Sequence, residues 1–463
     1  MTRPTFVCGL AALVAIVTAS GEDFPLTFRT IPAKDVMSFP GGSGSYTQLR
    51  PVKPTKLRKE PRAMSRHPLY GESRVTPSGP AFLFRLDESK GDGKGYDQLS
   101  VDMNQNGDLT DDPVSPRVVL PTDRRTGSSD QMVFGPIQAP ADKAVAGGRP
   151  VYFAQVYTFN RELLTSGRPD QITPSIFGQV MLKAGWYLDT TVEINGLKQK
   201  VGVYDGDSNL RLGDVAQSQI STTRAEKYWY FRPGDNLLVD TDGSGSFEND
   251  VFESDSCPFG PILYLGPKAY KVALAPDYKS LRVEPWTEPL AEVALSHRGD
   301  LVRSLTLAWQ PPGGQWQLIR PAVTNGKVMV PPGDYRLYAC SLLGKGAPRD
   351  QVMVSGIQRV PQSPVSIVAG KANTLNCGAP LDIKVTAVKS RASARGLLAE
   401  DTGGGKASSD YVLRINANVA GAGGEIYSTY LKGDGFKSRP PKPAFTIVQA
   451  GGKTVANGSL EYG

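Results

Sequence analysis

The sequence predicts a mainly all-β protein built from several modules, and three observations support this prediction. Short stretches such as 81–88 (AFLFRLDE), 190–195 (TTVEIN) and 411–419 (YVLRINANV) alternate apolar and polar residues, which is the period of a half-buried strand. The 50 glycines and 37 prolines disfavour long helices and mark turns. The 463 residues exceed what one hydrophobic core organises, so several domains are expected.

The first 20 residues have the features of an export signal. Arg3 precedes an apolar run at 6–17, and small residues follow at Ala19 and Ser20. The run is shorter than the roughly 20 residues that span a bilayer, so cleavage is expected rather than anchoring. We therefore predict a signal peptide at 1–20, no transmembrane segment after its removal, and a secreted, periplasmic or cell-surface location.

Residues 21–67 are rich in proline, glycine and serine, which predicts an extended or disordered linker. The stretch 50–66 carries most of the formal net charge of +7. A solvated basic tether accounts for this charge, and so does contact with an anionic polysaccharide or the cell-envelope surface. No nucleic-acid-binding motif accompanies it, so nucleic acid is not an expected partner.

The stretch 101–112 (VDMNQNGDLTDD) concentrates oxygen-bearing side chains between strand-like segments. Asp102, Asn104 and Asn106 stand at positions 1, 3 and 5 of a loop, and Gly107 at position 6 permits a sharp turn. Alternate residues direct their oxygens toward one centre, as in loops that bind calcium. The further acids of this loop are Asp108, Asp111 and Asp112.

A second loop repeats this spacing at 237–250 (LLVDTDGSGSFEND). Its positions 1, 3, 5, 6 and 11 are Asp240, Asp242, Ser244, Gly245 and Asp250. Each loop has an apolar residue at position 8 and is followed by the tetrapeptide FGPI, at 134–137 and again at 259–262. Shared blocks in the same order predict a duplicated unit of strand, acidic loop and strand.

A third, degenerate loop lies between these two. Asp205, Asp207 and Asn209 hold positions 1, 3 and 5, and Asp214 stands at position 10. Position 6 is Leu210, although a left-handed turn there favours glycine. This loop is therefore expected either to adopt another shape or to have lost tight metal binding. For all three loops, the alternative is that the acidic residues only cap turns.

The first two loops resemble the DxDxDG calcium loops of EF-hand and dockerin proteins. The wider pattern is similar to that of large exported bacterial multi-domain β-proteins, in which such loops punctuate β-sandwich modules of immunoglobulin-like or transthyretin-like type. This resemblance covers about residues 67–463 and brings no reaction with it.

The resemblance to calcium loops implies structural Ca2+ and a set of ligands. The side-chain ligands would be Asp102, Asn104, Asn106, Asp240, Asp242 and Ser244, and the backbone carbonyl ligands would be Asp108 and Ser246. Position 12 is Glu in EF-hands and Asp in dockerins, but it is Pro113 or Val251 here. Asp111, Asp112 and Asp250 are therefore expected to close the cages one or two residues earlier.

The turn signals divide the rest of the chain into modules. We predict a β-module with the first and the degenerate loop at 68–215, and one with the second loop at 216–287. An immunoglobulin-like or transthyretin-like sandwich is expected at 288–390, because strand-like runs flank a Pro-Pro-Gly corner there. A final β block follows at 391–463, with a hairpin around its Gly-Gly turn.

Three cysteines remain after signal removal, namely Cys257, Cys340 and Cys377. One disulfide with a leftover thiol and three free thiols are both open, and Cys340 with Cys377 is the pair to test. No CxxC motif is present, so neither a zinc ribbon nor a thioredoxin motif is predicted.

Enzymatic signatures are scarce in this sequence. No GxSxG, HExxH or P-loop motif occurs, and the histidines stand at a linker end and in a turn-like stretch. Tyr228 and Tyr230 should share one strand face while Trp229 takes the other, so at least one side is core. We predict a non-enzymatic, calcium-stabilised β-protein with a structural, cell-surface or binding role. The alternative is a carbohydrate-active hydrolase or carbohydrate-binding protein with a site in the duplicated region.

Overall fold

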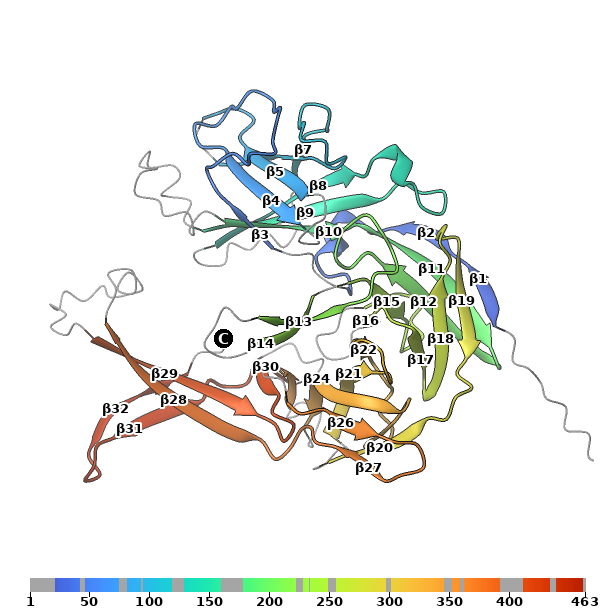
Figure 1. The fold of residues 1–463 in the computed structure, drawn as a ribbon. Coiled ribbons are helices and arrows are strands. Elements are labelled where there is room, and N and C mark those ends of the chain that lie inside the picture. Colours follow the sequence, from blue (N-terminus) through green and yellow to red (C-terminus); the bar gives the residue numbers. More distant parts are fainter. Residues whose placement is uncertain are drawn as a thin grey trace, which may run out of the picture.

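The computed structural model describes residues 21–41, 46–74, 81–92, 95–118, 129–159, 178–221, 228–232, 234–248, 255–296, 301–344, 352–358, 362–391, 411–433 and 439–460. The predicted signal peptide lies outside these residues. Within them the chain consists of strands and connecting loops, with one short helix, α1 (Ala33–Val36), and one 3-10 turn at Ala141–Lys143 (Figure 1). The predicted all-β class is confirmed. Among the described residues, no helix has the length and apolar character needed to cross a membrane.

The first module is an eight-stranded sheet in the order β3-β10-β9-β8-β7-β6-β5-β4. Its strands are β3 (Thr47–Leu49), β4 (Leu69–Arg74), β5 (Ala81–Asp87), β6 (Gln98–Val101), β7 (Ser115–Val118), β8 (Ser129–Gln138), β9 (Val151–Phe159) and β10 (Gly178–Ala184). A bridge between Arg50, which follows β3, and Tyr70 of β4 connects the two ends of this row. The sheet therefore closes into a ring of strands.

The second module consists of two sheets, in the orders β16-β15-β12-β11-β2 and β1-β19-β18-β17. Its strands are β1 (Glu22–Pro25), β2 (Thr27–Thr30), β11 (Trp186–Ile194), β12 (Leu197–Tyr204), β15 (Asn236–Val239), β16 (Ser256–Pro258), β17 (Ile262–Leu265), β18 (Lys268–Leu274) and β19 (Ser280–Pro285). One hydrophobic core runs through both modules, from Phe24 to Val283. The sheet with β11, β12 and β15 crosses the module boundary expected at residue 215.

Strand pairing around the two FGPI-linked loops is the same in both modules. In each module, the strand before the acidic loop pairs with two neighbouring strands, and the register of both pairings is the same in the two modules. The equivalent pairs are Val101–Phe84, Gln98–Asp87 and Gln98–Pro116 in the first module, and Val239–Val201, Asn236–Tyr204 and Asn236–Pro258 in the second. Thus β5, β6 and β7 correspond to β12, β15 and β16, as a duplicated unit requires.

The segment 21–67 is part of the fold, whereas the sequence predicts a linker there. It supplies β1, β2, β3 and α1, and it buries Phe24, Ile31, Val36 and Leu49 in the shared core. Phe24, Leu26 and Phe28 recur at every second residue, which is a strand period that the proline- and glycine-rich composition of the segment masks. Several basic residues also have acidic partners, in the ion pairs Lys53–Glu60, Lys56–Glu72 and Lys59–Asp108.

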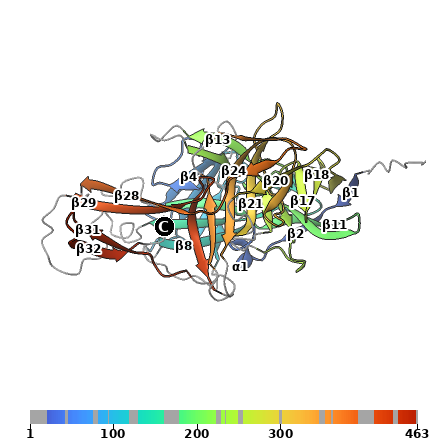
Figure 2. The ribbon, with the colours of Figure 1, turned by 90° about the horizontal axis from the view of Figure 1, so that it is seen from below.

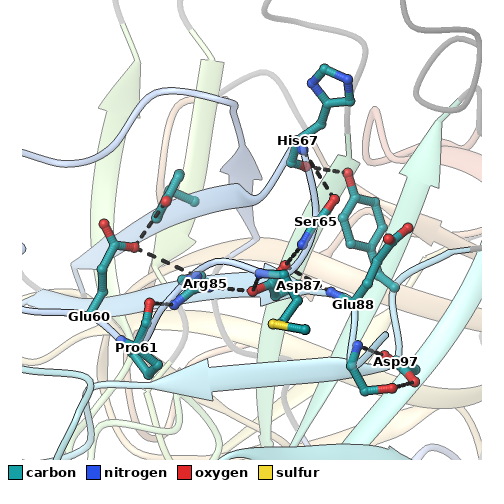
Figure 3. A network of polar contacts seen from close by, with 12 residues as sticks. Glu60, Pro61, Ser65, His67, Arg85, Asp87, Glu88 and Asp97 are labelled. Atoms are coloured by element: carbon teal, nitrogen blue, oxygen red, sulfur yellow. Dashed lines mark hydrogen bonds and ion pairs between the residues drawn. The ribbon is translucent and has the colours of Figure 1, made fainter. Parts of the chain in front are cut away.

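A buried arginine fixes the end of this segment against the first module (Figure 3). Arg85 of β5 donates to the Pro61 carbonyl at 2.5 Å and also to the Asp87 carboxylate. Asp87 in turn accepts from the backbone nitrogens of Met64 and Ser65, at 3.1 and 2.8 Å. The carboxylate and guanidinium are both desolvated but mutually paired, which is the condition for burying such charges.

The C-terminal part is a β-sandwich. One layer holds β20 (Ala291–Leu295), β23 (Lys327–Val330) and β27 (Asn373–Leu375). The other is ordered β22-β21-β24-β25-β30-β29-β28 and comprises β22 (Gln317–Ile319), β21 (Val302–Gln310), β24 (Gly333–Leu343), β25 (Val352–Ile357), β30 (Ile426–Lys432), β29 (Tyr411–Ala420) and β28 (Asp382–Arg391), while β26 (Val365–Ile367) pairs with β24. Both layers contribute to one core that includes Val293, Leu337 and Trp309. The predicted sandwich architecture is confirmed.

Two β-ribbons extend from the sandwich on one side of the molecule (Figures 1 and 2). One is β28 with β29, whose exposed side chains include Ile383 and Val385. The other is the hairpin of β31 (Ala444–Val448) and β32 (Thr454–Ser459). Gly451 and Gly452 in its turn have φ values of 104° and 86°, so the predicted Gly-Gly hairpin is confirmed.

A hairpin inserted between β12 and β15 packs the second module against the sandwich. It consists of β13 (Gln217–Ser221) and β14 (Tyr228–Arg232). Trp229 is buried in a small cluster with Phe231, Ala308 and Leu318, and Trp316 packs against this cluster. Tyr230, on the other strand face, is only half-buried, which matches the predicted division of the two faces.

Candidate metal centre

The three acidic loops each begin at the end of a strand, after β6, β12 or β15. The carboxylate at position 1 accepts hydrogen bonds from the backbone nitrogens at positions 5 and 6 in every loop. The distances are 3.0 and 2.8 Å for Asp102, 3.0 and 3.2 Å for Asp205, and 3.0 and 2.8 Å for Asp240. The degenerate loop therefore has the same internal hydrogen bonds as the other two.

The loops also share their backbone conformation. Positions 4 and 6 have positive φ in each loop: 59° and 80° at Gln105 and Gly107, 58° and 70° at Ser208 and Leu210, and 74° and 82° at Gly243 and Gly245. Of the two alternatives expected for Leu210, another loop shape is excluded, because the hydrogen bonds to Asp205 hold the leucine in the left-handed region. Such a residue stores roughly 1–2 kcal/mol of strain.

A returning carboxylate closes each loop by accepting from the backbone nitrogen at position 2. In the first loop Asp112 accepts from Met103 at 3.4 Å. In the degenerate loop Asp235 accepts from Gly206 at 3.1 Å, and in the loop after β15 Asp255 accepts from Thr241 at 3.1 Å. Asp235 and Asp255 come from outside the predicted loops and were not predicted.

In the first loop the structure brings most of the predicted ligands together. The side-chain amides of Asn104 and Asn106 both donate to Asp111 Oδ2, at 3.1 and 2.7 Å. Asp112 Oδ2 is buried without a hydrogen-bond partner, and burial raises the pKa of Asp112 to about 7. The Asp108 side chain instead points to Lys59, 2.9 Å away, which leaves only its carbonyl for the predicted role.

In the loop after β15, Asp240, Asp242 and Ser244 lie together. The Ser244 backbone nitrogen donates to Asp240 Oδ1 and to Asp242 Oδ1, each at 3.0 Å. The Ser246 and Ser244 hydroxyls are 3.1 Å apart. Asp250, which was expected to close this cage, lies outside the described residues. Asp255 is buried and takes that place at the position-2 nitrogen.

The degenerate loop has the densest carboxylate cluster. Asp205, Asp207 and Asp235 each offer an oxygen, and these oxygens lie within 4.8 Å of one another, the one such group of three potential ligand residues in the described part of the chain. Oxygens that bind one calcium ion at about 2.4 Å are at most about 4.8 Å apart, so this spacing fits. Asn209 donates to Asp214 Oδ2 at 2.6 Å, which places both beside the cluster.

The cluster is desolvated as well as dense. Asp205 and Asp235 are fully buried, and Tyr152 donates its hydroxyl to Asp205 at 2.5 Å. Asp207 Oδ1 is also buried and has no hydrogen-bond partner. Burial, and after it the charge of Asp205, raises the pKa of Asp207 to about 8, and burial with the same neighbour raises the pKa of Asp235. The site therefore disfavours three bare negative charges, which a divalent cation neutralises.

Among its described residues, the first module has no such cluster at the equivalent junction between β5 and β6. The residue matching Asp235 is Asp97, which accepts from the backbone nitrogen and the hydroxyl of Ser89 at 2.6 and 2.5 Å (Figure 3). A signal for Asp235 was nevertheless present, because GDNLLVD and GYDQLSVD align an aspartate five residues before the loop in both copies. Pairing β12 with β15, with Tyr204 opposite Asn236, places Asp235 beside Asp205.

The glycines at position 6 of the loops after β6 and β15 should differ in how much stability the protein loses when each is replaced by alanine. At Gly245 a new Cβ would meet no atom within 4 Å, so Gly245→Ala is expected to cost about 1 kcal/mol of stability through its positive φ alone. At Gly107 the Cβ would lie 2.6 Å from the Lys56 carbonyl oxygen, so Gly107→Ala should cost roughly 2–4 kcal/mol. Chemical denaturation in EDTA measures both, and equal losses would contradict the packing of segment 51–60 on the first loop.

Comparisons of the chain with protein-family models, with curated proteins and with solved structures gave no match.

Proposed function

We propose that this protein is a divalent-cation-binding β-protein, exported from the cytoplasm, in which Ca2+ stiffens the loops of the duplicated region. The observation that carries the proposal is the cluster of Asp205, Asp207 and Asp235 with its unpartnered, buried Asp207 oxygen. Carboxylate oxygens without nitrogen or sulfur donors suit a hard cation such as calcium. The ions serve a structural role, and the protein acts as a surface or binding module.

The carboxylates of this cluster support cation binding better than glycoside hydrolysis. A glycosidase needs two carboxyl groups about 5–10 Å apart on either side of a substrate in an open cleft. Here three carboxylate oxygens lie within 4.8 Å of one another, and two of the residues are fully buried. The loop conformation shared by all three sites extends the same chemistry to Asp102 and Asp240.

Calorimetric titration of calcium into the metal-free mature chain tests this function. We expect one ion per loop, with dissociation constants around 10⁻⁴–10⁻³ M, as in other extracellular calcium modules. Asp207→Asn should abolish binding at the degenerate loop while the other loops still bind. Asp142→Asn, at an exposed acid outside the loops, is the matched control and should bind as wild type does. A folded Asp207→Asn variant with unchanged stoichiometry would refute the site.

A further inference from the structure

Two buried cysteines meet in the core of the sandwich. Cys340 lies in the middle of β24, and Cys377 follows β27 by two residues, so the two sulfurs come from opposite layers. Both are buried in the same hydrophobic core. In this structure both are free thiols, and interaction with the Cys377 thiol, followed by desolvation, raises the pKa of Cys340.

The backbone around Cys377 is held in place by a buried glutamate. Glu425 Oε1 accepts from the backbone nitrogen of Gly378 at 2.5 Å and from the hydroxyl of Tyr427 at 2.8 Å. The Ala422 backbone nitrogen also donates to the Gly378 carbonyl at 2.8 Å. These contacts fix the segment that carries Cys377 against the layer that carries Cys340. The two thiols are therefore pre-positioned by the fold and not by chance contact of mobile loops.

Cys257 lies apart from the other two described cysteines. It lies in β16 of the second module, on a different sheet from the other two cysteines, and burial raises its pKa to about 11. The structure thus separates the odd cysteine from the pair, which spacing in the sequence did not do.

We infer that Cys340 and Cys377 form a disulfide that joins the two layers of the sandwich. A thiolate of one cysteine attacks an external disulfide oxidant, and the second cysteine then displaces the oxidant from the mixed disulfide. The S–S bond forms as two S–H bonds are lost, and the oxidant takes up the two electrons and two protons to become a dithiol. Because both sulfurs are buried in the native fold, the oxidant reaches the first thiol before the layers close, and closure of the layers then brings the second thiol to the mixed disulfide.

The test uses the mature full-length chain folded in an oxidising compartment. The protein is denatured without reductant, alkylated and weighed intact, and then the same is done after reduction. We expect one alkylated thiol before reduction and three after it, with a crosslinked peptide containing Cys340 and Cys377. Three alkylated thiols before reduction, or a bond that includes Cys257, would overturn the inference.

Thermal unfolding supplies a second readout. Reduction should lower the melting temperature of the wild type by roughly 5–15 °C, and it should lower that of Cys257→Ala by the same amount. A Cys340→Ala/Cys377→Ala variant should melt at one temperature with or without reductant. Equal sensitivity of this double variant and the wild type to reductant would contradict the bond, and the mass measurement decides the question even if the variant fails to fold.

Discussion

Replacing Trp229 with alanine is expected to lower the stability of the protein by about 3–5 kcal/mol, the usual loss for truncating a fully buried tryptophan. The indole packs edge-on against Phe231 and Trp316, at centroid distances of 5.2 and 6.2 Å, and Arg336 lies over its ring at 5.3 Å. Its nitrogen also donates to the Ser218 hydroxyl at 2.8 Å. One substitution therefore removes packing within the hairpin and between the hairpin and the sandwich.

The measurement is thermal unfolding together with limited proteolysis of the hairpin. Tyr230→Ala is the matched control, because it truncates a large aromatic residue on the opposite, half-buried face of the same strand. We expect Trp229→Ala to lower the melting temperature much more than Tyr230→Ala and to expose the hairpin to protease. Equal shifts for the two variants would mean that the cluster does not hold the modules together.

Millimolar calcium is expected to raise the melting temperature of the EDTA-treated chain by several degrees. A ligand that binds only the folded state stabilises it by RT ln(1 + [L]/Kd), so each site adds about 1.4 kcal/mol at ten times its Kd. Three occupied loops would add about 4 kcal/mol if they act independently. Thermal unfolding across a calcium titration, with magnesium at the same concentration for comparison, measures this gain.

The effect of Asp207→Asn on stability is expected to change sign between EDTA and calcium. In EDTA the variant should be at least as stable as the wild type, because the neutral amide removes the cost of ionising Asp207 in a buried site beside Asp205. In calcium it should be less stable than the wild type, because it has lost a charged ligand. If the cluster were only a set of turn caps, calcium would not change the order of the two proteins.

Local patterns in the sequence were sufficient to predict the loops. The sequence pattern locates the aspartates at position 1 and the oxygen-bearing residues at positions 3 and 5 because they are neighbours along the chain. Asp235 and Asp255 were missed because each reaches its loop from another segment of the chain. Propensity disfavours the left-handed conformation of Leu210, so the sequence alone left another loop shape open, whereas the hydrogen bonds to Asp205 impose the shared one.

The same distinction holds for the fold. Alternating runs such as those in β5 and β11 predicted strands directly, since one face of each is buried. The strands β1, β2 and β3 are only three or four residues long, and their place in the sheets depends on partners far away in sequence. Composition alone therefore suggested a linker, whereas long-range pairing makes this segment part of three sheets.

The junction that holds Asp205 and Asp235 has a practical consequence for protein engineering. In the first module, residues 88–97 connect β5 with β6. In the second module, residues 205–235 connect the equivalent strands β12 and β15 and include the hairpin of β13 and β14. The flanking strands pair in the same register in both cases. The connection between β5 and β6 is therefore an attractive graft point for a peptide epitope or a small reporter domain, since its ends already match a junction that accepts a large insert.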